Sequence, residues 1–152
     1  MSNIEARISA LGHTLPDAPA PAANYVPFVV TGKHLFVSGQ ISNGPDGLIC
    51  GKLGADLTTE EGAKAAETCA LALLAQAKAA TGDLSKVARL VKLVGFVNST
   101  PDFTDQPKVI NGASDLMVAV LGDAGRHARS AVSAASLPLG VAVEIEAIFE
   151  LA

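Results

Sequence analysis

Two segments of the chain carry apolar residues at three- and four-residue steps, the spacing typical of helices that pack against a core. In the first, apolar side chains recur from Ala63 to Ala77 and would share one helical face. Thr58 with Glu61 three positions later is a capping-box sequence, and Gly82 is a typical stop signal. We therefore predict a long helix that begins just after Thr58 and ends at Gly82.

A second helix is predicted to begin near residue 104 or 105, with apolar positions on one face between Val109 and Val120. Pro107 would stand in its first turn, where the missing N–H costs no hydrogen bond, and Gly122 would end it. Residues 3–11 form a shorter helical pattern that stops at Gly12. Prolines follow at positions 16, 19 and 21, so residues 1–24 are expected to include an extended N-terminal arm.

Runs of β-branched and other apolar residues predict the strands. Val87 to Val97 is nearly continuous Val and Leu, as in a strand buried on both faces. Leu137-Pro138-Leu139-Gly140 is expected to turn the strand that begins at Arg129 back toward the last strand. The other predicted strands cover residues 25–30, 34–38 with a continuation to 41, 48–50 and 141–149.

The last strand places its carboxylates on one face. Side chains on a strand alternate between faces, so Glu144, Glu146 and Glu150 fall together. The apolar side chains of the same run fall on the opposite face, at positions 141, 143, 145 and 149. This alternation predicts a strand with one buried and one polar side.

The order of strands, helix, strand, helix, strand predicts a single α+β domain over residues 1–152, with both long helices on one face of the sheet. The other face then needs a cover, and a neighbouring subunit is the available one. Composition points the same way, because 49% of the residues are hydrophobic and only 17% are charged. Interfaces between permanently associated subunits are similarly apolar.

Charge and cysteine content narrow the class of protein. The net charge of -4 and the lack of a basic run disfavour capture of nucleic acid. Cys50 and Cys69 lack the spacing of a metal site, so no metal is expected. The first residues do not form a signal peptide, and the apolar stretch at 62–80 contains three charges. A protein of the cytoplasm, without membrane contact, is therefore expected.

Arg129 and Glu144 are the leading candidates for chemistry. A guanidinium fork fits a carboxylate through two hydrogen bonds. The plainer alternative, which residue type alone favours, is a surface arginine that pairs with Asp123 or a helix end. Burial would tune the Glu144 carboxylate to accept a proton from water. The plainer alternative is a solvated strand face shared with Glu146 and Glu150.

Four further residues are weaker candidates. Ser38 and Gly39 lie where a strand stops, and the glycine would let backbone approach a ligand or simply form a bulge. Tyr25 would cap a pocket or lie at the edge of the core. Asn111 is a poor helix former within a predicted helix, which indicates a packing or functional demand. The histidines, at positions 13, 34 and 127, have no Ser or Cys motif beside them, so a nucleophilic triad has little support.

Four motifs together resemble the RidA (YjgF) family of imine and enamine deaminases, also labelled the endoribonuclease L-PSP family. They are Ser38-Gly39-Gln40-Ile41, Ala128-Arg129-Ser130-Ala131-Val132, Leu137-Pro138 and Val143-Glu144-Ile145-Glu146-Ala147. The resemblance is collinear from about Tyr25 to Phe149. It implies a chorismate-mutase-like α+β fold and a homotrimer with ligand clefts between adjacent subunits.

The resemblance also implies roles for individual residues. Arg129 would hold the substrate carboxylate with help from the backbone amide of Ala131, and Glu144 would orient the attacking water. The other aligned substrate-binding positions are Tyr25, Ser38, Gly39 and Asn111. No cofactor or metal is implied.

The chain departs from the archetypal pattern at three motif positions and in an N-terminal arm, to Asn24, that is longer than usual. Ser42 stands where the archetypes have Pro, and Gly112-Ala113-Ser114 stands where they tend to carry aromatic residues. His127-Ala128 replaces a pair that usually includes Pro. These departures indicate a divergent branch with a differently shaped pocket.

The resemblance predicts hydrolysis of small 2-imino or enamine acids to 2-oxo acids and ammonia, at a site between subunits. The alternative is a non-catalytic trimer that binds a small carboxylate or regulates a partner. Ribonuclease activity, a third possibility, is disfavoured by the acidic net charge of -4.

Overall fold

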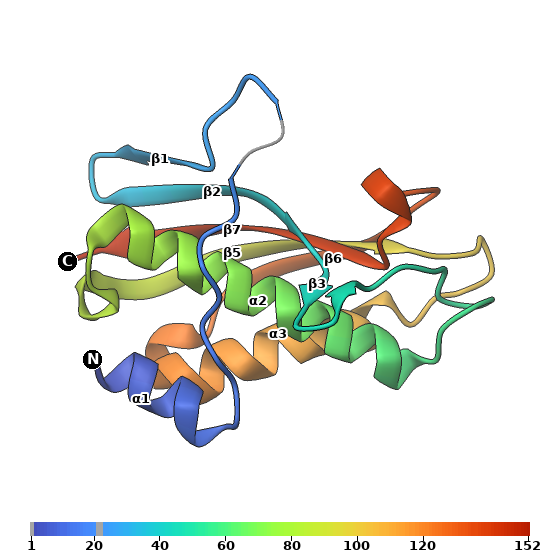
Figure 1. Ribbon diagram of the computed structural model, residues 1–152, viewed down its shortest axis with the longest axis horizontal. Helices are drawn as coiled ribbons and strands as arrows, with labels where there is room; N and C mark the ends of the chain where they lie inside the picture. Colours follow the sequence, from blue (N-terminus) through green and yellow to red (C-terminus); the bar gives the residue numbers. More distant parts are fainter. Residues whose placement is uncertain (1, 21–22) are drawn as a thin grey trace.

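The computed structural model describes residues 2–20 and 23–152, and its centre is a five-stranded mixed sheet (Figure 1). The strand order is β1-β2-β7-β5-β6, and every neighbouring pair is antiparallel except β5 and β6, which are parallel. The strands are β1 (Phe28–Thr31), β2 (His34–Ile41), β5 (Val87–Asn98), β6 (Ala128–Ala134) and β7 (Val143–Leu151). The edges of this sheet are therefore β1 on one side and β6 on the other.

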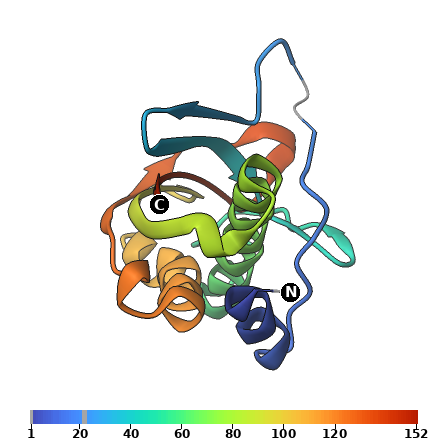
Figure 2. The same cartoon turned by 90° about the vertical axis from the view of Figure 1, so that its left-hand side faces the viewer.

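The α-helices form a layer on one face of the sheet (Figures 1 and 2). The helices α2 (Thr59–Thr81) and α3 (Gln106–Leu121) pack against each other and against the sheet. The short helix α1 (Asn3–Ala10) packs on α3 and buries Ile8. The α+β architecture predicted from the order of elements is confirmed, as a mixed sheet with three helices.

Helix α2 begins where its sequence predicted. The Thr58 hydroxyl accepts a hydrogen bond from the Glu61 backbone N–H, and the Glu61 carboxylate accepts one from the Thr58 N–H, both at 3.1 Å. Together these bonds satisfy two N–H groups that the first turn leaves free. Gly82 ends the helix in the left-handed conformation with φ 77°, which glycine adopts without steric cost.

Helices α2 and α3 cross closely at Gly112. A Cβ atom at this position would overlap the backbone carbonyl group of Ala63 on α2. Only a residue without a side chain therefore allows this approach. The crossing fixes the height of α3 above the sheet, and with it the position of the neighbouring Asn111.

The predicted turn between the last two strands is wrong, because β6 and β7 are not neighbours. β5 lies between them, with β6 parallel on one side and β7 antiparallel on the other. After β6 the chain passes through the 3₁₀ turn η3 (Pro138–Gly140) and crosses the end of β5, where the Asn98 N–H donates to the Ala142 carbonyl at 2.9 Å. The nearly continuous apolar sequence of β5 suits this central position.

Two other predicted strands are shorter than expected. β1 starts at Phe28, and Tyr25 lies in a bend before it. The residues predicted as a strand at 48–50 form only the end of a small hairpin, β3 (Asn43–Gly44) with β4 (Gly47–Leu48). Cys50 makes one isolated bridge to Val141.

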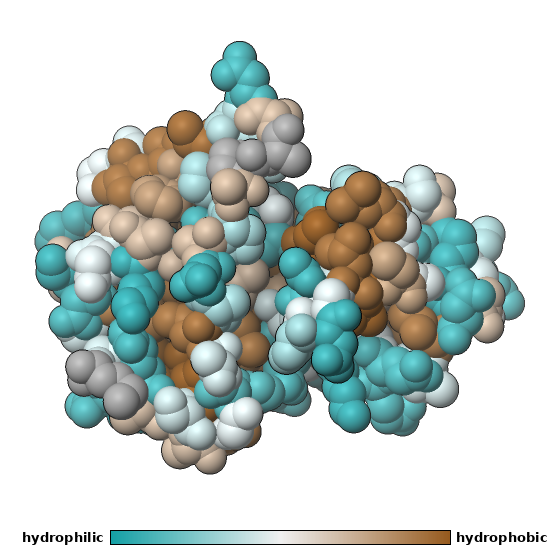
Figure 3. Space-filling model, viewed as in Figure 1, coloured by the Kyte–Doolittle hydropathy of each residue, from teal (hydrophilic) through white to brown (hydrophobic). Residues whose placement is uncertain are grey.

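The face of the sheet opposite the helices carries no helix in the described part of the chain. Phe36 and Val132 on this open face are 43% and 45% exposed, which is high for large apolar side chains. Hydrophobic surface also gathers over β1 and beside η3 (Figure 3), where Val29, Val30 and Leu139 are exposed. Exposed apolar area of this extent is typical of a protein interface.

Candidate functional site

Arg129 projects from the edge strand β6 toward helix α3. One terminal nitrogen, Nη1, donates to Asn111 Oδ1 at 2.8 Å and to Ser114 Oγ at 3.2 Å. Asn111 and Ser114 are three residues apart on α3, so they lie on the same side of the helix. The sequence indicated a packing or functional demand at Asn111, and in the structure the side-chain amide of Asn111 anchors the arginine.

The rest of the Arg129 guanidinium is not used within the described chain. No hydrogen bond joins Nε or Nη2 to a described residue, and no described carboxylate lies within 4 Å of it as an ion-pair partner. Asp123, the partner named in the plainer interpretation, instead lies 3.5 Å from Arg126 Nε. A guanidinium with one nitrogen anchored and one edge free matches the geometry that binds a carboxylate through two hydrogen bonds.

Ala131 lies two residues after Arg129 on the edge strand β6. The Ser99 N–H donates to the Ala134 carbonyl at 3.3 Å, so the polar groups of Ala134 point toward β5. Backbone groups alternate sides along a strand, which turns those of Ala131 outward from the sheet. An edge strand leaves such groups unpaired. The Ala131 amide is therefore available as a second donor near Arg129.

Glu144 lies on β7, half-buried, against a bulge in β2. The register between β2 and β7 shifts between Val37 and Gln40, which leaves Ser38 and Gly39 as the irregular residues. A Cβ atom on Gly39 would overlap the Glu144 carboxylate and would lie 3.0 Å from its Cδ. The absence of a side chain at Gly39 thus makes room for the carboxylate, and bulges of this kind are common beside active sites.

The surroundings of Glu144 favour its neutral form. Partial burial raises the pKa of the Glu144 carboxyl, and the negative charge of Glu146 raises it further. No described side chain forms a hydrogen bond or an ion pair with this carboxylate. A carboxylate that is partly desolvated and unpaired is suited to accept a proton.

Ser38 connects the bulge to the segment that carries Tyr25. The Ser38 hydroxyl donates to the Val26 carbonyl at 3.0 Å, and its backbone N–H donates to the Pro27 carbonyl at 2.9 Å. Tyr25 is 52% exposed and lies in the bend before β1. The interpretation of Tyr25 as a core-edge residue is therefore less suitable than that of an exposed ring available to a ligand or partner.

The predicted site residues, together with Ser114, form two groups within one chain. We call Arg129, Asn111, Ser114 and Ala131 the arginine half-site, and Tyr25, Ser38, Gly39 and Glu144 the glutamate half-site. The arginine half-site lies on β6 and α3, and the glutamate half-site lies on β7 and β2, with Tyr25 in the bend before β1.

The two half-sites face different sides of the sheet. Arg129 is paired with Leu93, which is fully buried beneath the helices, whereas Glu144 lies between the fully buried Val143 and Ile145 and so points to the open face. On β5, Phe96 is paired both with Glu144 of β7 and with Val132 of β6, so Glu144 and Val132 lie at the same height in the sheet. Strand spacings of about 4.8 Å and a rise of about 3.3 Å per residue place the Arg129 and Glu144 Cα atoms about 14 Å apart. One small substrate cannot contact both side chains of the same chain.

A family model described as "YjgF/chorismate mutase-like, putative endoribonuclease" matches residues 5–151. The chain belongs to the YjgF (RidA) family. Protein TCP17 from Trypanosoma cruzi is 53% identical over 150 residues, which cover 97% of this chain and 94% of that protein. The RutC family protein y4sK from Sinorhizobium fredii is 33% identical, over 89% of this chain and 93% of the relative.

Solved structures support the same assignment. The protein Atu1372 of unknown function from Agrobacterium tumefaciens has a TM-score of 0.93 and 51% identity, over 99% of this chain and 93% of that one. The YjgF gene product of Escherichia coli has a TM-score of 0.63 and 31% identity, over 88% of this chain and 93% of that one. The family resemblance predicted from the sequence motifs is confirmed.

Two residues in the surroundings of Arg129 were not predicted as functional. Ser114 and His127 appeared in the sequence only as departures from the archetypal pattern, yet both belong to the hydrogen-bonded surroundings of Arg129. His127 Nε2 lies 2.9 Å from Ser114 Oγ, and its Nδ1 lies 2.6 Å from the Gly125 carbonyl oxygen. A usable signal was the three-residue step from Asn111 to Ser114, which places both on one side of α3.

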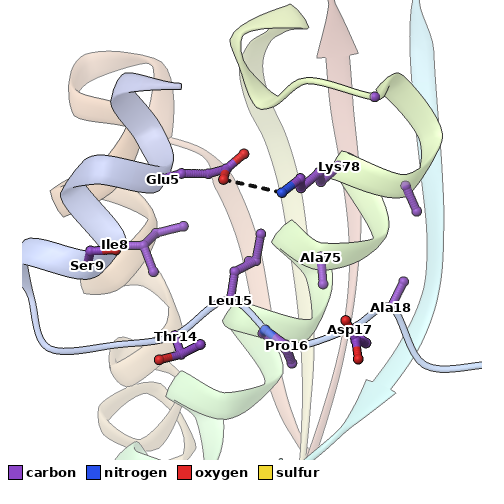
Figure 4. A pocket seen from close by; sticks show the side chains of 12 residues that line it. Glu5, Ile8, Ser9, Thr14, Leu15, Pro16, Asp17, Ala18, Ala75 and Lys78 are labelled. Carbon is purple, nitrogen blue, oxygen red and sulfur yellow. Dashed lines mark hydrogen bonds and ion pairs between the residues drawn. The ribbon is translucent and has the colours of Figure 1, made fainter. Parts of the chain in front are cut away.

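Two cavities lie beside the N-terminal segment and include no residue of either half-site. One, of about 630 Å³, is bounded by α1, α2 and residues 14–18 (Figure 4). Its cation Lys78 is paired with Glu5 at 3.2 Å. The other, of about 650 Å³, contains His13, which lies 2.9 Å from Glu67. Neither cavity is lined by Arg129 or Glu144, and the second also includes the cation Lys64.

The described residues contain no group of three or more His, Cys, Asp or Glu side chains placed to hold a metal ion. In the same described residues, none of the helices combines the length and apolar character needed to span a bilayer.

Proposed function

We propose that this YjgF-family protein hydrolyses small 2-imino or enamine acids to 2-oxo acids and ammonia, at sites formed between adjacent subunits of a homotrimer. The observation that carries the proposal is the state of Arg129. Its Nη1 is fixed by Asn111 and Ser114, while its other edge has no partner in the described chain. This arrangement suits a ligand with a carboxylate, the group that every 2-imino acid carries.

The separation of the half-sites supports assembly between subunits. An interface that joins different surfaces of identical chains closes into a ring when its rotation permits. The β6 edge of one chain would bring Arg129 and the Ala131 amide to the glutamate half-site of the next chain. The exposed apolar residues of the open face, such as Phe36 and Val132, would then be covered. Three copies are the number that the family resemblance implies.

The proposed reaction uses each half-site for one task. Arg129 and the Ala131 amide hold the carboxylate, so that the iminium carbon faces Glu144 of the neighbouring copy. Glu144 accepts a proton from a water whose oxygen forms a bond to that carbon, and the C=N electron pair moves to nitrogen. Glu144 then returns the proton to nitrogen, the C–N bond breaks, and a lone pair of the hydroxyl oxygen forms the carbonyl. The hydroxyl proton leaves with ammonia as ammonium.

The charges of the site fit this sequence. An iminium cation is attracted to the Glu144 carboxylate, and the substrate carboxylate is attracted to Arg129. Because burial raises the pKa of Glu144, its carboxylate is a stronger base than an exposed one. Positioning would supply much of the rate increase, since imines already react with water unaided.

A coupled assay tests this function. A threonine or serine dehydratase generates the enamine, and release of the 2-oxo acid is followed with wild type, Arg129→Ala, Glu144→Gln and the control Arg126→Ala. Wild type and the control should accelerate release, and the two half-site variants should lose at least about 90% of that acceleration, as expected when one orienting or proton-transfer group is removed. If wild type gives no acceleration, the deaminase assignment is wrong.

Binding measurements distinguish the alternative class of protein. Calorimetry with 2-oxobutanoate that shows Arg129-dependent binding, together with no turnover in the coupled assay, would favour a carboxylate-binding or regulatory trimer. We also propose a location in the cytoplasm, where thiols stay reduced, since Cys50 and Cys69 are both free.

A further inference from the structure

Arg129 is the end of a chain of hydrogen bonds that crosses from β6 to α3 and back. Its Nη1 lies 3.2 Å from Ser114 Oγ, which lies 2.9 Å from His127 Nε2. The other ring nitrogen, Nδ1, lies 2.6 Å from the Gly125 carbonyl oxygen in the 3₁₀ turn η2 (Gly122–Gly125). We infer that His127, acting through Ser114, is a positioning residue for Arg129. The consequence for substrate affinity rests on the proposed carboxylate-binding role of that arginine.

The direction of every bond in this chain is fixed by chemistry. A backbone carbonyl can only accept, so His127 Nδ1 must carry the hydrogen and donate to Gly125. In the neutral ring Nε2 is then an acceptor and receives the Ser114 hydroxyl hydrogen. The hydroxyl oxygen keeps its lone pairs for Arg129 Nη1–H. His127 therefore directs the Ser114 hydroxyl hydrogen away from the arginine, so that a lone pair of Ser114 Oγ stays available to accept from Nη1.

Arg129 needs such an anchor because of where it lies. It is a long side chain on an edge strand, and no described carboxylate holds it. Without a second fixed acceptor, its guanidinium would be tied to α3 by Asn111 alone. Two acceptors one helical turn apart restrict the guanidinium plane, and a restricted fork loses less conformational entropy when it binds a carboxylate.

We call Ser114 and His127 the relay residues. Both occupy positions where the chain departs from the archetypal family pattern. Ser114 stands in the segment where the archetypes tend to carry aromatic residues, and His127 stands in the pair that usually includes Pro. A Pro has no side-chain donor or acceptor for Ser114, and an aromatic hydrocarbon ring has none for His127. The hydrogen bond between Ser114 and His127 therefore requires both departures from the archetypal pattern.

Nuclear magnetic resonance tests the relay without reference to any reaction. In the intact protein labelled with ¹⁵N, long-range correlations of His127 should show the Nδ1–H tautomer at neutral pH. The Arg129 side-chain signals should shift or broaden in His127→Ala and in Ser114→Ala, and should not change in the control His34→Ala, an exposed histidine on β2. An Nε2–H tautomer, or Arg129 signals unaffected by both relay variants, would overturn the inference.

Ligand affinity tests the functional consequence, with 2-oxobutanoate as the probe and calorimetry as the method. His127→Ala and Ser114→Ala should each weaken binding about tenfold, the usual effect of removing a hydrogen bond that serves a charged group. The double variant should bind 2-oxobutanoate with about the same affinity as either single variant, because the two residues act through one chain of hydrogen bonds. In the coupled assay KM should rise more than kcat falls.

Conservative variants separate positioning from simple loss of structure. His127→Gln places an amide oxygen that can accept from Ser114, and Ser114→Thr keeps the hydroxyl, so both should recover most of the affinity. Wild-type affinity in both alanine variants, while Arg129→Ala binds more weakly, would refute the relay and leave the proposed function standing. If Arg129→Ala binds like wild type, the proposed function fails, and the resonance experiment still decides whether the relay exists.

Discussion

Arg129 and Glu144 lie on opposite faces of the same sheet, on strands separated by β5. Neither residue would complete the proposed site by itself. Arg129 has a free guanidinium edge but no base near it, and Glu144 is a half-buried base with no cation near it among the described residues. The proposed activity therefore depends on assembly, because Arg129 and Glu144 could act on one substrate only if a second copy of the chain brings them together.

Mixed oligomers provide the most direct test of this assembly. Arg129→Ala and Glu144→Gln should each be inactive alone. When both are refolded or expressed together, a mixed ring of three contains one junction that joins an intact Arg129 to an intact Glu144. With random mixing, about one quarter of all sites are intact, so activity should return to about one quarter of wild type. Two wild-type chains labelled differently serve as the exchange control, and no recovery in mixed rings would overturn the proposed site between subunits.

Gly39→Ala should displace the Glu144 carboxylate. The new Cβ would overlap that carboxylate, whose flexible end can move away without disturbing the backbone. Stability should change little, whereas kcat in the coupled assay should fall about tenfold, because a misplaced base loses most of its proton-transfer contribution.

Gly32→Ala is the matched control. It lies in the β1–β2 turn with φ 58° and open space around it, so it should lower stability by about 1 kcal/mol through backbone strain and leave kcat unchanged. Full activity in Gly39→Ala would contradict the placement of Glu144 as the base.

The pH profile of kcat/KM should report the environment of Glu144. Its raised pKa means that the base is protonated, and inactive, up to a higher pH than an exposed glutamate would be. Glu146→Gln removes the like charge that contributes to this shift, so the acidic limb should move to lower pH. Glu150→Gln, on the same face but without a contribution to the raised pKa of Glu144, is the control. An acidic limb unmoved by Glu146→Gln would show that another group controls it.

Glu144→Gln should stabilise the folded protein at neutral pH. A carboxyl whose pKa is raised on folding binds its proton more tightly in the folded state, so the stability it contributes is full below its unfolded pKa and declines as pH rises through the folded pKa. Glutamine does not titrate and avoids that loss. Urea unfolding should therefore give a larger free energy of unfolding for the variant at pH 7, with the difference disappearing near pH 4, about the ordinary pKa of glutamate. A difference that grows toward low pH would contradict the raised pKa.

Gly112→Ala should weaken the whole arginine half-site. Its Cβ would meet the Ala63 backbone, which cannot rotate away, so α3 must shift with Asn111 and Ser114. We expect a loss of about 1–3 kcal/mol in stability, the usual cost of overpacking, and weaker binding of 2-oxobutanoate. Lys108→Ala, an exposed change on the same helix, should stay within about 0.5 kcal/mol of wild type. Unchanged stability and binding in Gly112→Ala would show that the helices can separate freely.

Local interactions explain the parts of this structure that the sequence predicted. The capping box at Thr58 and Glu61 joins groups three residues apart, so it could be read directly and marks the start of α2. The alternation along β7 placed Glu144 opposite the buried Val143 and Ile145 for the same reason. Arg129 and Glu144 could be proposed from residue type and motif.

Long-range pairing explains the parts that it did not predict. Turn residues near Pro138 indicated a reversal of the chain, but they could not show that β5 would lie between β6 and β7. The partners of Arg129 are 15 and 18 residues away along the chain, and no periodic pattern connects them. His127 and Ser114 were visible only as unusual residues until the fold placed them together.

The sequence alone thus determined the helices, which side chains share a face within each strand, and the chemical groups available. These features depend on spacings of two to four residues. Only the tertiary structure decided which strands are neighbours and which side of the sheet each group faces, because these depend on packing between distant segments. That packing placed the arginine and the glutamate apart, and so made a neighbouring subunit part of the proposed site.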